Sequence, residues 1–380
     1  MPGISAVIVS IVFMALSIFI GSHFLTEPDT SIFKKSALRF YNSIYEKLQK
    51  KNKEGIVGFG YTGCRDLSVD TLSFIEKLGY TFTPQEKTRI ITIQDFVETF
   101  ASFFSLGAST EIFMESEMYF NGLISKMEGL PNTTTFGGNA PHMALRATKE
   151  SYKAILVADI GKEEINTIKS LDENSMMVIV PVNETREHSD IHLIFEYPAT
   201  NYKGVKSPKS NKFYLNHDTI SPKLLAVDKY LEVAQYYNVS KHAFSGFHLI
   251  QKLPLEEALQ LLGKVQAQWD MLRKRGSQTI HIEMGAFQNV DLYKAVIEGL
   301  IIKADSLGIN ELEALILHEL LKEKAFKTLI GPCSDVNILL KKIFEIIEII
   351  EKNKATLSRL HIHARSMHHL CYRGNNTITY

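Results

Sequence analysis

Acidic residues and a pair of glycines stand where apolar segments of the sequence end. Asp66 closes a glycine-rich stretch, Glu111 follows a helix stop signal, and Gly137-Gly138 precede Asn139 and a helical pattern. Carboxylates accept hydrogen bonds from hydroxyl groups, and glycines let a backbone approach a polar ligand closely. Each motif also has a structural explanation: Asp66 as an N-cap, Glu111 as a solvated loop acid, and the glycine pair as a turn with a helix cap.

The stretch from Gly58 to Asp66 reads Gly-Phe-Gly-Tyr-Thr-Gly-Cys-Arg-Asp and contains the G-x-G-x-x-G spacing of dinucleotide-binding turns. Such a site also needs an acidic residue at the end of a second strand, about 20 residues further on. Residues 80–87 have the pattern of a loop, so a dinucleotide site is not favoured. Asp66 remains as an acid between a predicted strand, Ile56–Gly60, and a predicted helix, Val69–Leu78.

Two further carboxylates have the surroundings of ligands for a hard cation. Glu283 closes a strand-like run that contains His281, and Glu313 lies in the first turn of a helix that follows a break at Gly308. Carboxylates at strand ends and helix starts hold Mg²⁺ in proteins, commonly through water. Taken singly, a helix cap or a surface ion pair explains each of them as well.

The C-terminal region is rich in histidine. His361 and His363 alternate with apolar residues, so a strand would place both on one face, where they could ligate a transition metal; His368-His369 follow. No Cys or Asp completes the ligand set at the usual spacing, and the stretch is also compatible with a helix. A transition-metal site here is therefore not favoured.

The elements that must position these residues alternate between strands and helices. Strand-like runs are Ile56–Gly60, Lys153–Ile160, Met176–Val182, Ile191–Tyr197, His242–Leu249, Thr279–Met284 and Lys327–Ile330. Helical periodicity covers Gln94–Leu106, Glu115–Met127, Ser221–Tyr236, Leu255–Lys274, Leu292–Ala304, Glu311–Lys322 and Asp335–Glu351. This alternation predicts βαβ units and an α/β fold with a mainly parallel sheet, whose ligands collect at the carboxyl ends of the strands.

The N-terminus predicts entry into the secretory pathway. Residues 4–20 form an almost unbroken apolar run that Gly21-Ser22 follow, as in a signal peptide. The first three residues carry no basic side chain, so an uncleaved signal-anchor is a close alternative and a buried core helix a third. We assign residues 1–25 to this segment and 26–54 to an amphipathic helix or linker. The expected location is the endoplasmic reticulum lumen, its membrane, or the outside of the cell.

Composition limits the class of protein. The 380 residues carry 42 Lys and Arg against 42 Asp and Glu, which gives a formal net charge of +0. That balance argues against general binding to nucleic acid, although it leaves room for a local anion site. The three cysteines, Cys64, Cys333 and Cys371, are too few and too scattered for a disulfide framework or a structural zinc site.

Taken in order, these segments resemble the ADP-dependent glucokinase family, the eukaryotic branch of the ribokinase-like ADP-dependent sugar kinases. The resemblance runs from about Gly55 to Leu370 and rests on Val57–Asp66, Gly107–Glu111, Gly137–Ala140, His192–Tyr197, Asn211–Phe213, His217-Asp218, Ser245–His248, His281–Glu283, Ser306–Glu313 and Arg359–His363. It implies a ribokinase-like large domain, with a mainly parallel sheet flanked by helices, and a smaller α/β lid. It also implies a monomeric glycolytic enzyme that uses Mg²⁺ and transfers the β-phosphoryl group of ADP to the 6-hydroxyl of glucose.

The resemblance gives roles to the residues at matching positions. The sugar contacts are Asp66, Glu111, Gly137, Gly138 and Asn139. The contacts on the phosphate and lid side are Glu196, Asn211 and Lys212, the nucleotide-side residues are His248 and His361, and the metal-organising acids are Glu283 and Glu313. A sugar site built from buried carboxylates rejects analogues that lack the hydroxyl groups, because the carboxylates would then be left unpaired.

Two features depart from the family pattern. The family has Arg where this sequence has Lys212, which keeps the charge but loses bidentate contact with phosphate. The family's catalytic Asp lies in a C-terminal Gly-x-Gly-Asp motif, which these 380 residues do not contain. We expect a kinase domain over 55–371 that is incomplete at its C-terminus, a divergent tail over 372–380, and negligible turnover. A non-catalytic protein that binds sugar, nucleotide or a protein partner is the alternative.

Overall fold

The computed structural model describes residues 55–87, 89–322, 336–352, 356–363, 368–374 and 377–379. The segments predicted over 1–54 lie outside the described residues, as does the strand predicted at Lys327–Ile330. Among the helices that the structure describes, none is both long enough and apolar enough to cross a membrane.

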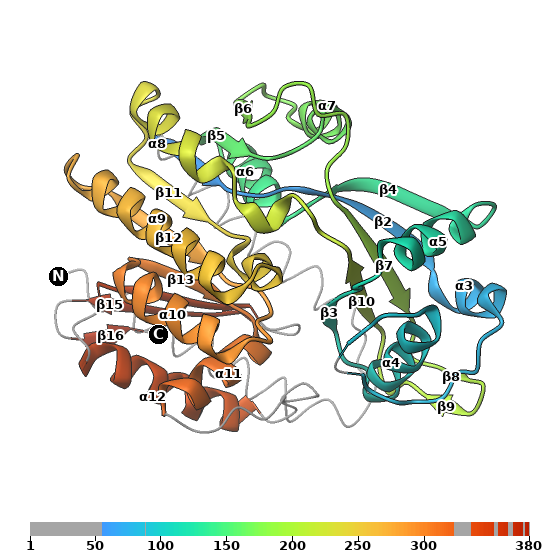
Figure 1. The fold of residues 1–380 in the computed structure, drawn as a ribbon. Coiled ribbons are helices and arrows are strands. Elements are labelled where there is room, and N and C mark those ends of the chain that lie inside the picture. The colour runs from blue at the N-terminus through green and yellow to red at the C-terminus, as the bar shows by residue number, and fades with distance from the viewer. Residues whose placement is uncertain are drawn as a thin grey trace, which may run out of the picture.

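The large lobe is built on a nine-stranded sheet with the order β16-β15-β14-β13-β12-β11-β1-β5-β6 (Figure 1). Its strands are β1 (Ile56–Gly60), β5 (Lys153–Ala158), β6 (Met177–Pro181), β11 (Lys241–Phe244), β12 (Thr279–Glu283), β13 (Ser306–Ile309), β14 (Arg359–His363), β15 (His368–Gly374) and β16 (Thr377–Thr379). Every pair from β6 to β14 is parallel, and the β14–β15 and β15–β16 pairs are antiparallel. The predicted α/β fold with a mainly parallel sheet is confirmed.

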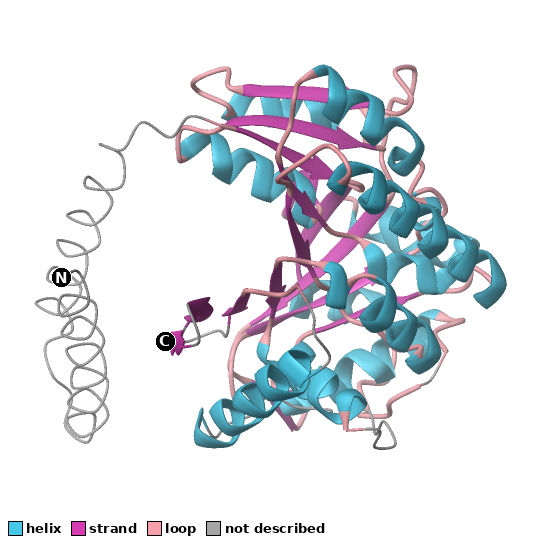
Figure 2. Ribbon diagram, turned by 90° about the vertical axis from the view of Figure 1, so that its left-hand side faces the viewer, coloured by secondary structure: helices cyan, strands magenta, loops and turns pink. Residues whose placement is uncertain are grey.

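Helices flank this sheet (Figure 2), and successive residues of its central strands are buried on opposite faces. In β5, Ile155 and Val157 belong to one hydrophobic cluster, whereas Leu156 and its alternate neighbours belong to another. The first cluster also takes residues from α8 (Ala226–Tyr236), α9 (Leu255–Arg273), α10 (Val290–Gly299), α11 (Glu311–Leu321) and α12 (Val336–Lys352). The second takes residues from α6 (Asn139–Lys149) and α7 (Lys162–Leu171).

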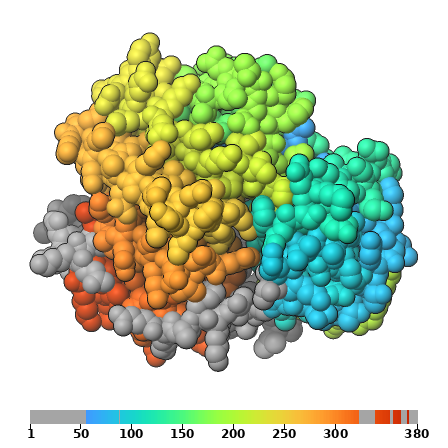
Figure 3. Space-filling model, viewed as in Figure 1, coloured from blue at the N-terminus to red at the C-terminus, as the bar shows by residue number. Residues whose placement is uncertain are grey.

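The small lobe is a five-stranded sheet with the order β3-β10-β7-β2-β4, and it stands beside the large lobe in blue and cyan in Figure 3. Its strands are β2 (Cys64–Asp70), β3 (Thr110–Phe113), β4 (Asn132–Gly137), β7 (Ile191–Tyr197) and β10 (Asn211–Asn216). Its helices are α3 (Thr71–Leu78), α4 (Ile93–Leu106) and α5 (Glu117–Met127), and a small hairpin is formed by β8 (Asn201–Tyr202) and β9 (Val205–Lys206). This lobe matches the smaller α/β lid that the resemblance implied.

Side chains alternate across the small sheet, apolar on one face and polar on the other. Leu193, Phe195 and Phe213 pack with the helices in a phenylalanine-rich core. Their neighbours along the same strands, such as His192 and Lys212, line a cavity on the opposite face. This period of two is the expected pattern for a sheet that has one face in a core and one face on solvent or a ligand.

The N-cap interpretation of Asp66 is wrong. Strand β2 continues through Asp66 to Asp70, because it pairs with both β4 and β7 along this length. Helix α3 begins at Thr71, and the Asp70 carboxylate caps it by accepting the backbone N–H of Ser73 at 2.9 Å. The glycine-rich stretch after β1 therefore leads into a strand, so it lacks the helix that a dinucleotide-binding turn requires.

Two other predicted elements end earlier in the structure than expected, and a short 3₁₀ helix follows each of them. The strand predicted to reach Leu249 ends at Phe244, and Gly246, at a φ of 90°, leads into the 3₁₀ helix η2 (Phe247–Lys252). The helix predicted to reach Ala304 ends at Gly299 and is followed by the 3₁₀ helix η3 (Ile301–Lys303). The Thr-rich segment that leads to the glycine pair, for which no strand was predicted, is strand β4.

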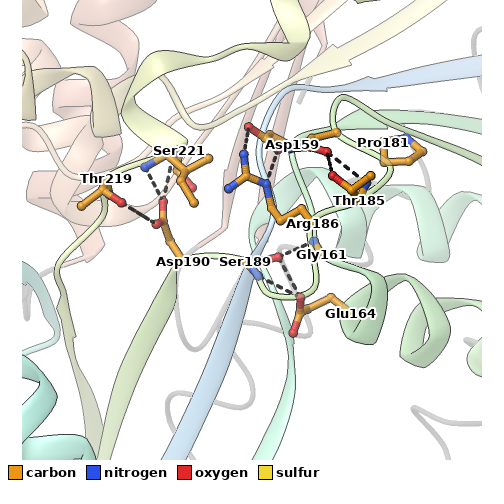
Figure 4. A network of polar contacts seen from close by, with 12 residues as sticks. Asp159, Gly161, Glu164, Pro181, Thr185, Arg186, Ser189, Asp190, Thr219 and Ser221 are labelled. Atoms are coloured by element: carbon orange, nitrogen blue, oxygen red, sulfur yellow. Dashed lines mark hydrogen bonds and ion pairs between the residues drawn. The ribbon is translucent and has the colours of Figure 1, made fainter.

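A polar network ties together the chain crossings between the two lobes (Figure 4). Asp190 directly precedes β7 of the small sheet, and its carboxylate accepts the backbone N–H groups of Thr219, Ile220 and Ser221 at 3.2, 3.0 and 2.7 Å. Those three residues carry the chain from β10 back into the large lobe at the 3₁₀ helix η1 (Ser221–Lys223). One buried carboxylate thus couples the entry into the small lobe to the exit from it.

Candidate active site

A cavity of about 1220 Å³ takes its walls from both lobes. The predicted site residues that line it are Asp66, Glu111, Gly138, Asn139, Glu196, Asn211, Lys212, His248, Glu283 and Glu313. Gly137 and His361 are not among its lining residues. Residues from segments far apart in the sequence therefore meet in one cavity, which has two acidic ends.

The pairing of the small sheet builds the first acidic end. Asp66 on β2 lies opposite His192 on β7, and His192 lies opposite Asn216 on β10, so the three form one row across the sheet. On the neighbouring strand, Glu111 of β3 lies opposite Tyr214 of β10. We call this group of residues, together with the loop at Gly138-Asn139, the hydroxyl end of the cavity.

Glu111 is ionised at the hydroxyl end. Its Oε1 accepts a hydrogen bond from Asn216 Nδ2 at 2.7 Å, its Oε2 lies 3.3 Å from His248 Nε2, and His192 Nδ1 lies 3.8 Å from Oε1. Burial alone would raise the pKa of Glu111, but the two histidines and the amide outweigh it and lower the pKa to about 2. A carboxylate held in this form is a strong acceptor for a hydroxyl group.

Asp66 differs from Glu111 because burial dominates its electrostatics. Burial raises the pKa of Asp66 above its usual value, against the opposing effect of His192. Its side chain lies over Gly137 of β4, where an added Cβ would stand 2.0 Å from Asp66 Oδ1. Gly137 therefore acts in the site by leaving room for Asp66, and not by lining the cavity.

His192 is held by a second carboxylate behind it. Its Nε2 lies 3.0 Å from both oxygens of Asp218, which is buried at 3% exposure. Burial opposes a charged imidazole, but the carboxylate of Asp218 more than offsets this and raises the pKa of His192 well above its usual value. The ring is thus fixed with Nδ1 directed to the Glu111 side.

The glycine pair opens a helix toward the same end. Gly138 is the N-cap of α6 with a φ of 91°, a conformation that side chains rarely adopt, and no side chain caps the helix there. The first N–H groups of a helix have no partner within the helix, so those of α6 are suited to a polar ligand. Both the turn interpretation and the ligand interpretation of this motif remain compatible with the structure.

The second acidic end is built by neighbouring parallel strands of the large sheet. Glu283 ends β12, and its two oxygens lie 2.7 Å from His363 Nε2 and 3.3 Å from His281 Nε2. Burial would raise the pKa of Glu283, but these two histidines lower it to about 2. Gly308 lies on the adjacent strand β13 and leaves room for the Glu283 carboxylate, because an added Cβ there would stand 2.0 Å from Glu283 Oε2. We call this region the cation end.

Glu313 combines a structural role with a place at the cation end. Its Oε2 accepts the backbone N–H of Asn310 at 2.8 Å in a capping box at the start of α11, which confirms the cap interpretation. Burial, together with the negative charge of Glu283, raises the pKa of Glu313 to about 7. Carboxylate oxygens are the donors that Mg²⁺ prefers, and a divalent cation would relieve this repulsion, so the residues fit a magnesium ion.

The phosphate-side residues lie on an exposed part of the small sheet. Lys212 Nζ lies 2.7 Å from Glu196 Oε1, and the two residues are paired across β10 and β7. The amide of Asn211 donates to the carbonyl oxygen of Gly107 at 2.8 Å, which fixes the segment that leads to Glu111. Lys212 is therefore the residue of this group that presents a positive charge to the cavity.

The two predicted nucleotide-side histidines have different surroundings. His248 contacts Glu111 at the hydroxyl end, as given above. His361 shares a strand face with His363, at 5.7 Å between ring centroids, but only His363 reaches the cavity. The strand alternative for this stretch is thus confirmed as β14.

The sequence assigned no role to four residues of the site, His192, Asp218, Tyr214 and Cys64, and it indicated His363 only as a possible transition-metal ligand. His192 and Asp218 are 26 positions apart, so no local spacing connects them. The alternation of polar and apolar residues in 191–197 and 211–216 was the available signal, because it marks a sheet with one polar face.

Residues 56–379 match the family described as the ADP-specific phosphofructokinase/glucokinase conserved region. The chain belongs to this family. A "Probable ADP-dependent glucokinase" of Caenorhabditis elegans is 25% identical over 349 residues, which are 85% of this chain and 66% of that protein. The chain thus spans about two thirds of the length of that relative.

Solved structures of the ADP-dependent kinases share the fold of this family member. An ADP-dependent kinase in complex with fructose 6-phosphate and ADPβS superposes with a TM-score of 0.65 at 16% identity, over 91% of this chain and 74% of the other. A phosphofructokinase from Pyrococcus horikoshii with AMP gives 0.57 at 16% identity, over 85% and 76%. The α/β fold implied by the sequence is therefore the fold of these ADP-dependent kinases, and membership of the family rests on the match over residues 56–379.

Proposed function

We propose that this member of the ADP-dependent sugar kinase family acts on glucose, and that its reaction is the transfer of the β-phosphoryl group of ADP to the 6-hydroxyl. One observation carries the proposal: the predicted sugar acids Asp66 and Glu111 and the predicted metal acids Glu283 and Glu313 line the same cavity. Similarity to the probable ADP-dependent glucokinase supports glucose as the sugar.

The hydroxyl end binds the sugar in this account. Glu111, ionised by its two histidines, accepts hydrogen bonds from sugar hydroxyl groups, and Asp66 does so from the neighbouring strand. The N–H groups at the start of α6 and the amide of Asn139 bind a further oxygen. Glucose is selected because a sugar that lacks one of these hydroxyl groups leaves a buried polar group unpaired.

The cation end holds the charges of the donor. Glu283 and Glu313 would hold Mg²⁺, directly or through water, and the bound ion supplies charge neutralisation for the transferred phosphoryl group. His281 and His363 keep Glu283 ionised and fixed in place. Lys212 offers a positive charge from the small lobe, although a single ammonium lacks the bidentate geometry of arginine.

A second candidate, a sugar-binding protein without turnover, is favoured by one observation. Among the described residues that line the cavity, we assign none as the general base for the 6-hydroxyl. In this case the hydroxyl end retains its affinity, but no group takes the proton from the 6-hydroxyl.

The experiment measures binding and turnover on the same protein. Glucose binding to residues 26–380 is followed by calorimetry, and glucose 6-phosphate formation is followed with ADP and Mg²⁺, with ATP as the alternative donor. The test variant is Asp66→Asn, and the matched control is Asp228→Asn, an exposed aspartate on α8.

Glucose binding that Asp66→Asn weakens and Asp228→Asn leaves unchanged supports the sugar site. Turnover with ADP that Glu283→Ala abolishes would support the kinase, whereas glucose binding without turnover would favour the second candidate. Absence of glucose binding would contradict both candidates.

A further inference from the structure

Three side chains at the hydroxyl end form a donor set that sugar binding does not explain. Cys64 and Asp66 lie two residues apart on β2, so their side chains share one face of the strand, and His192 lies opposite Asp66 on β7. Their sulfur, oxygen and nitrogen donor atoms all lie within 4.8 Å of one another. All three residues line the cavity, so the set is reached from it.

The spacing of Cys64 and Asp66 fits two ligands of a tetrahedral metal ion. Cys64 Sγ and Asp66 Oδ1 are 3.4 Å apart. In a tetrahedral zinc site, the standard metal–sulfur and metal–carboxylate bond lengths place these two atoms about 3.6 Å apart. Gly137 makes this possible, because an added Cβ there would stand 2.6 Å from Cys64 Sγ and 2.0 Å from Asp66 Oδ1.

A separate contact, with the carboxylate of Asp218, orients His192 for metal binding. Its Nε2 is held by both oxygens of Asp218 at 3.0 Å, which leaves Nδ1 as the nitrogen on the cavity side. Metal-binding histidines have this arrangement, in which a carboxylate behind the ring fixes its orientation and makes the free nitrogen more basic. Glu111 Oε1, 3.8 Å from Nδ1, adds negative charge beside the open coordination position.

We propose that Cys64, Asp66 and His192 bind a thiophilic divalent cation of the Zn²⁺ class, distinct from the magnesium ion of the cation end. Binding releases the thiol proton of Cys64 and the Nδ1 proton of His192 to solvent. The fourth position faces the cavity and is open to water. Because the ion takes Asp66 from the hydroxyl end, it excludes the sugar, a consequence that rests on the proposed function. The low number and wide spacing of the cysteines argued against a structural zinc site, but a mixed donor set assembled from two strands needs only one cysteine.

The test uses Co²⁺ as a spectroscopic substitute for Zn²⁺. Metal-free protein is titrated with Co²⁺ in excess Mg²⁺, which occupies carboxylate sites without displacing a thiolate-bound ion. We expect one equivalent to bind with the intense near-ultraviolet charge-transfer band of a cobalt–thiolate bond and with tetrahedral visible bands. Zn²⁺ is expected to abolish both by displacement.

Matched cysteine variants assign the band. Cys64→Ser is expected to lose it, and Cys371→Ser, at another buried cysteine, is expected to keep it. Asp218→Asn keeps the three ligands and is expected to weaken Co²⁺ binding about 10–100-fold. Thermal unfolding of each variant in metal-free buffer shows that it is folded.

Absence of a thiolate band in the intact protein, or its persistence in folded Cys64→Ser, would overturn the metal site. Glucose is then added to the cobalt-loaded protein. Loss of the band supports mutual exclusion. If the cobalt–thiolate band is retained while glucose is bound, the metal and the sugar do not exclude each other. If the band is retained and glucose does not bind to the metal-free protein either, the proposed function is contradicted and the metal site stands.

Discussion

The two ends of the cavity use the same electrostatic arrangement on different scaffolds. At each end one carboxylate is held by two histidines at a pKa of about 2, Glu111 in one case and Glu283 in the other. At each end a second carboxylate has a raised pKa because it is buried, Asp66 in one case and Glu313 in the other. A glycine on the adjacent strand makes room for one carboxylate at each end.

The two ends differ in the charged neighbours of the carboxylate whose pKa is raised. Asp66 lies beside His192, a positive neighbour that lowers its pKa again, whereas Glu313 lies beside the negative charge of Glu283. The charged neighbour with the largest effect on the pKa is therefore positive for Asp66 and negative for Glu313. A cation would relieve the repulsion between Glu313 and Glu283, whereas Asp66 already has a positively charged neighbour.

The largest expected effect comes from filling the two glycine positions. Gly137→Ala places a Cβ 2.0 Å from Asp66 Oδ1, so we expect glucose affinity to fall about 100-fold through displacement of the carboxylate. Gly308→Ala makes the equivalent contact with Glu283 Oε2 and is expected to weaken Mg²⁺ binding while leaving glucose affinity unchanged. Calorimetric titration of each variant measures both.

Gly122→Ala is the control for this pair, since nothing lies within 4 Å of the added Cβ on helix α5. Loss of glucose binding in Gly308→Ala as large as in Gly137→Ala would show that the two ends are not separate sites.

A pH dependence of opposite sign is expected from the two ends. Glu313, with a pKa of about 7 against an ordinary 4.5, binds its proton more tightly in the folded state, so its contribution to stability is present below pH 4.5 and is lost as the pH rises through 7. Glu111, at about 2, contributes stability above pH 4.5 that is lost as the pH falls toward 2.

In cation-free buffer, Glu313→Gln should therefore be more stable than the unmodified protein at pH 8, by up to about 3 kcal/mol, and equal to it near pH 4.5. Glu111→Gln should be less stable at pH 8. Melting temperatures across the pH range measure both. A Glu313→Gln variant that is destabilised equally at all pH values would show that the capping box, and not the buried charge, dominates at this position.

The large sheet and the cation end were more predictable than the small sheet and the hydroxyl end. Apolar runs such as Ile56–Gly60 mark buried parallel strands, and Glu283 at the end of such a run points to the ligand edge of the sheet. The small sheet consists of short strands and has one polar face. Strand pairing places Asp66 within β2, whereas the local sequence was also compatible with a helix cap at this residue. The His192–Asp218 contact depends on that pairing and has no local signal.

The smallest effect is expected at Lys212, which forms an exposed pair with Glu196. Lys212→Arg should change stability by less than about 0.5 kcal/mol, because exposed ion pairs contribute little. It should raise affinity for ADP a few-fold, because guanidinium contacts phosphate through two hydrogen bonds. Binding of ADP by calorimetry checks this, with Lys203→Arg, in another exposed pair, as the control. A loss of ADP affinity in Lys212→Arg would place the phosphates elsewhere.

The division of the cavity into a hydroxyl end and a cation end is tested most directly by one titration. Glucose binding is measured in magnesium-free buffer for Glu111→Gln and Glu313→Gln in parallel. We predict a loss of about 10–100-fold for Glu111→Gln, the value of a hydrogen bond to a charged group, and no change for Glu313→Gln. Equal losses in the two variants, or a larger loss in Glu313→Gln, would contradict it.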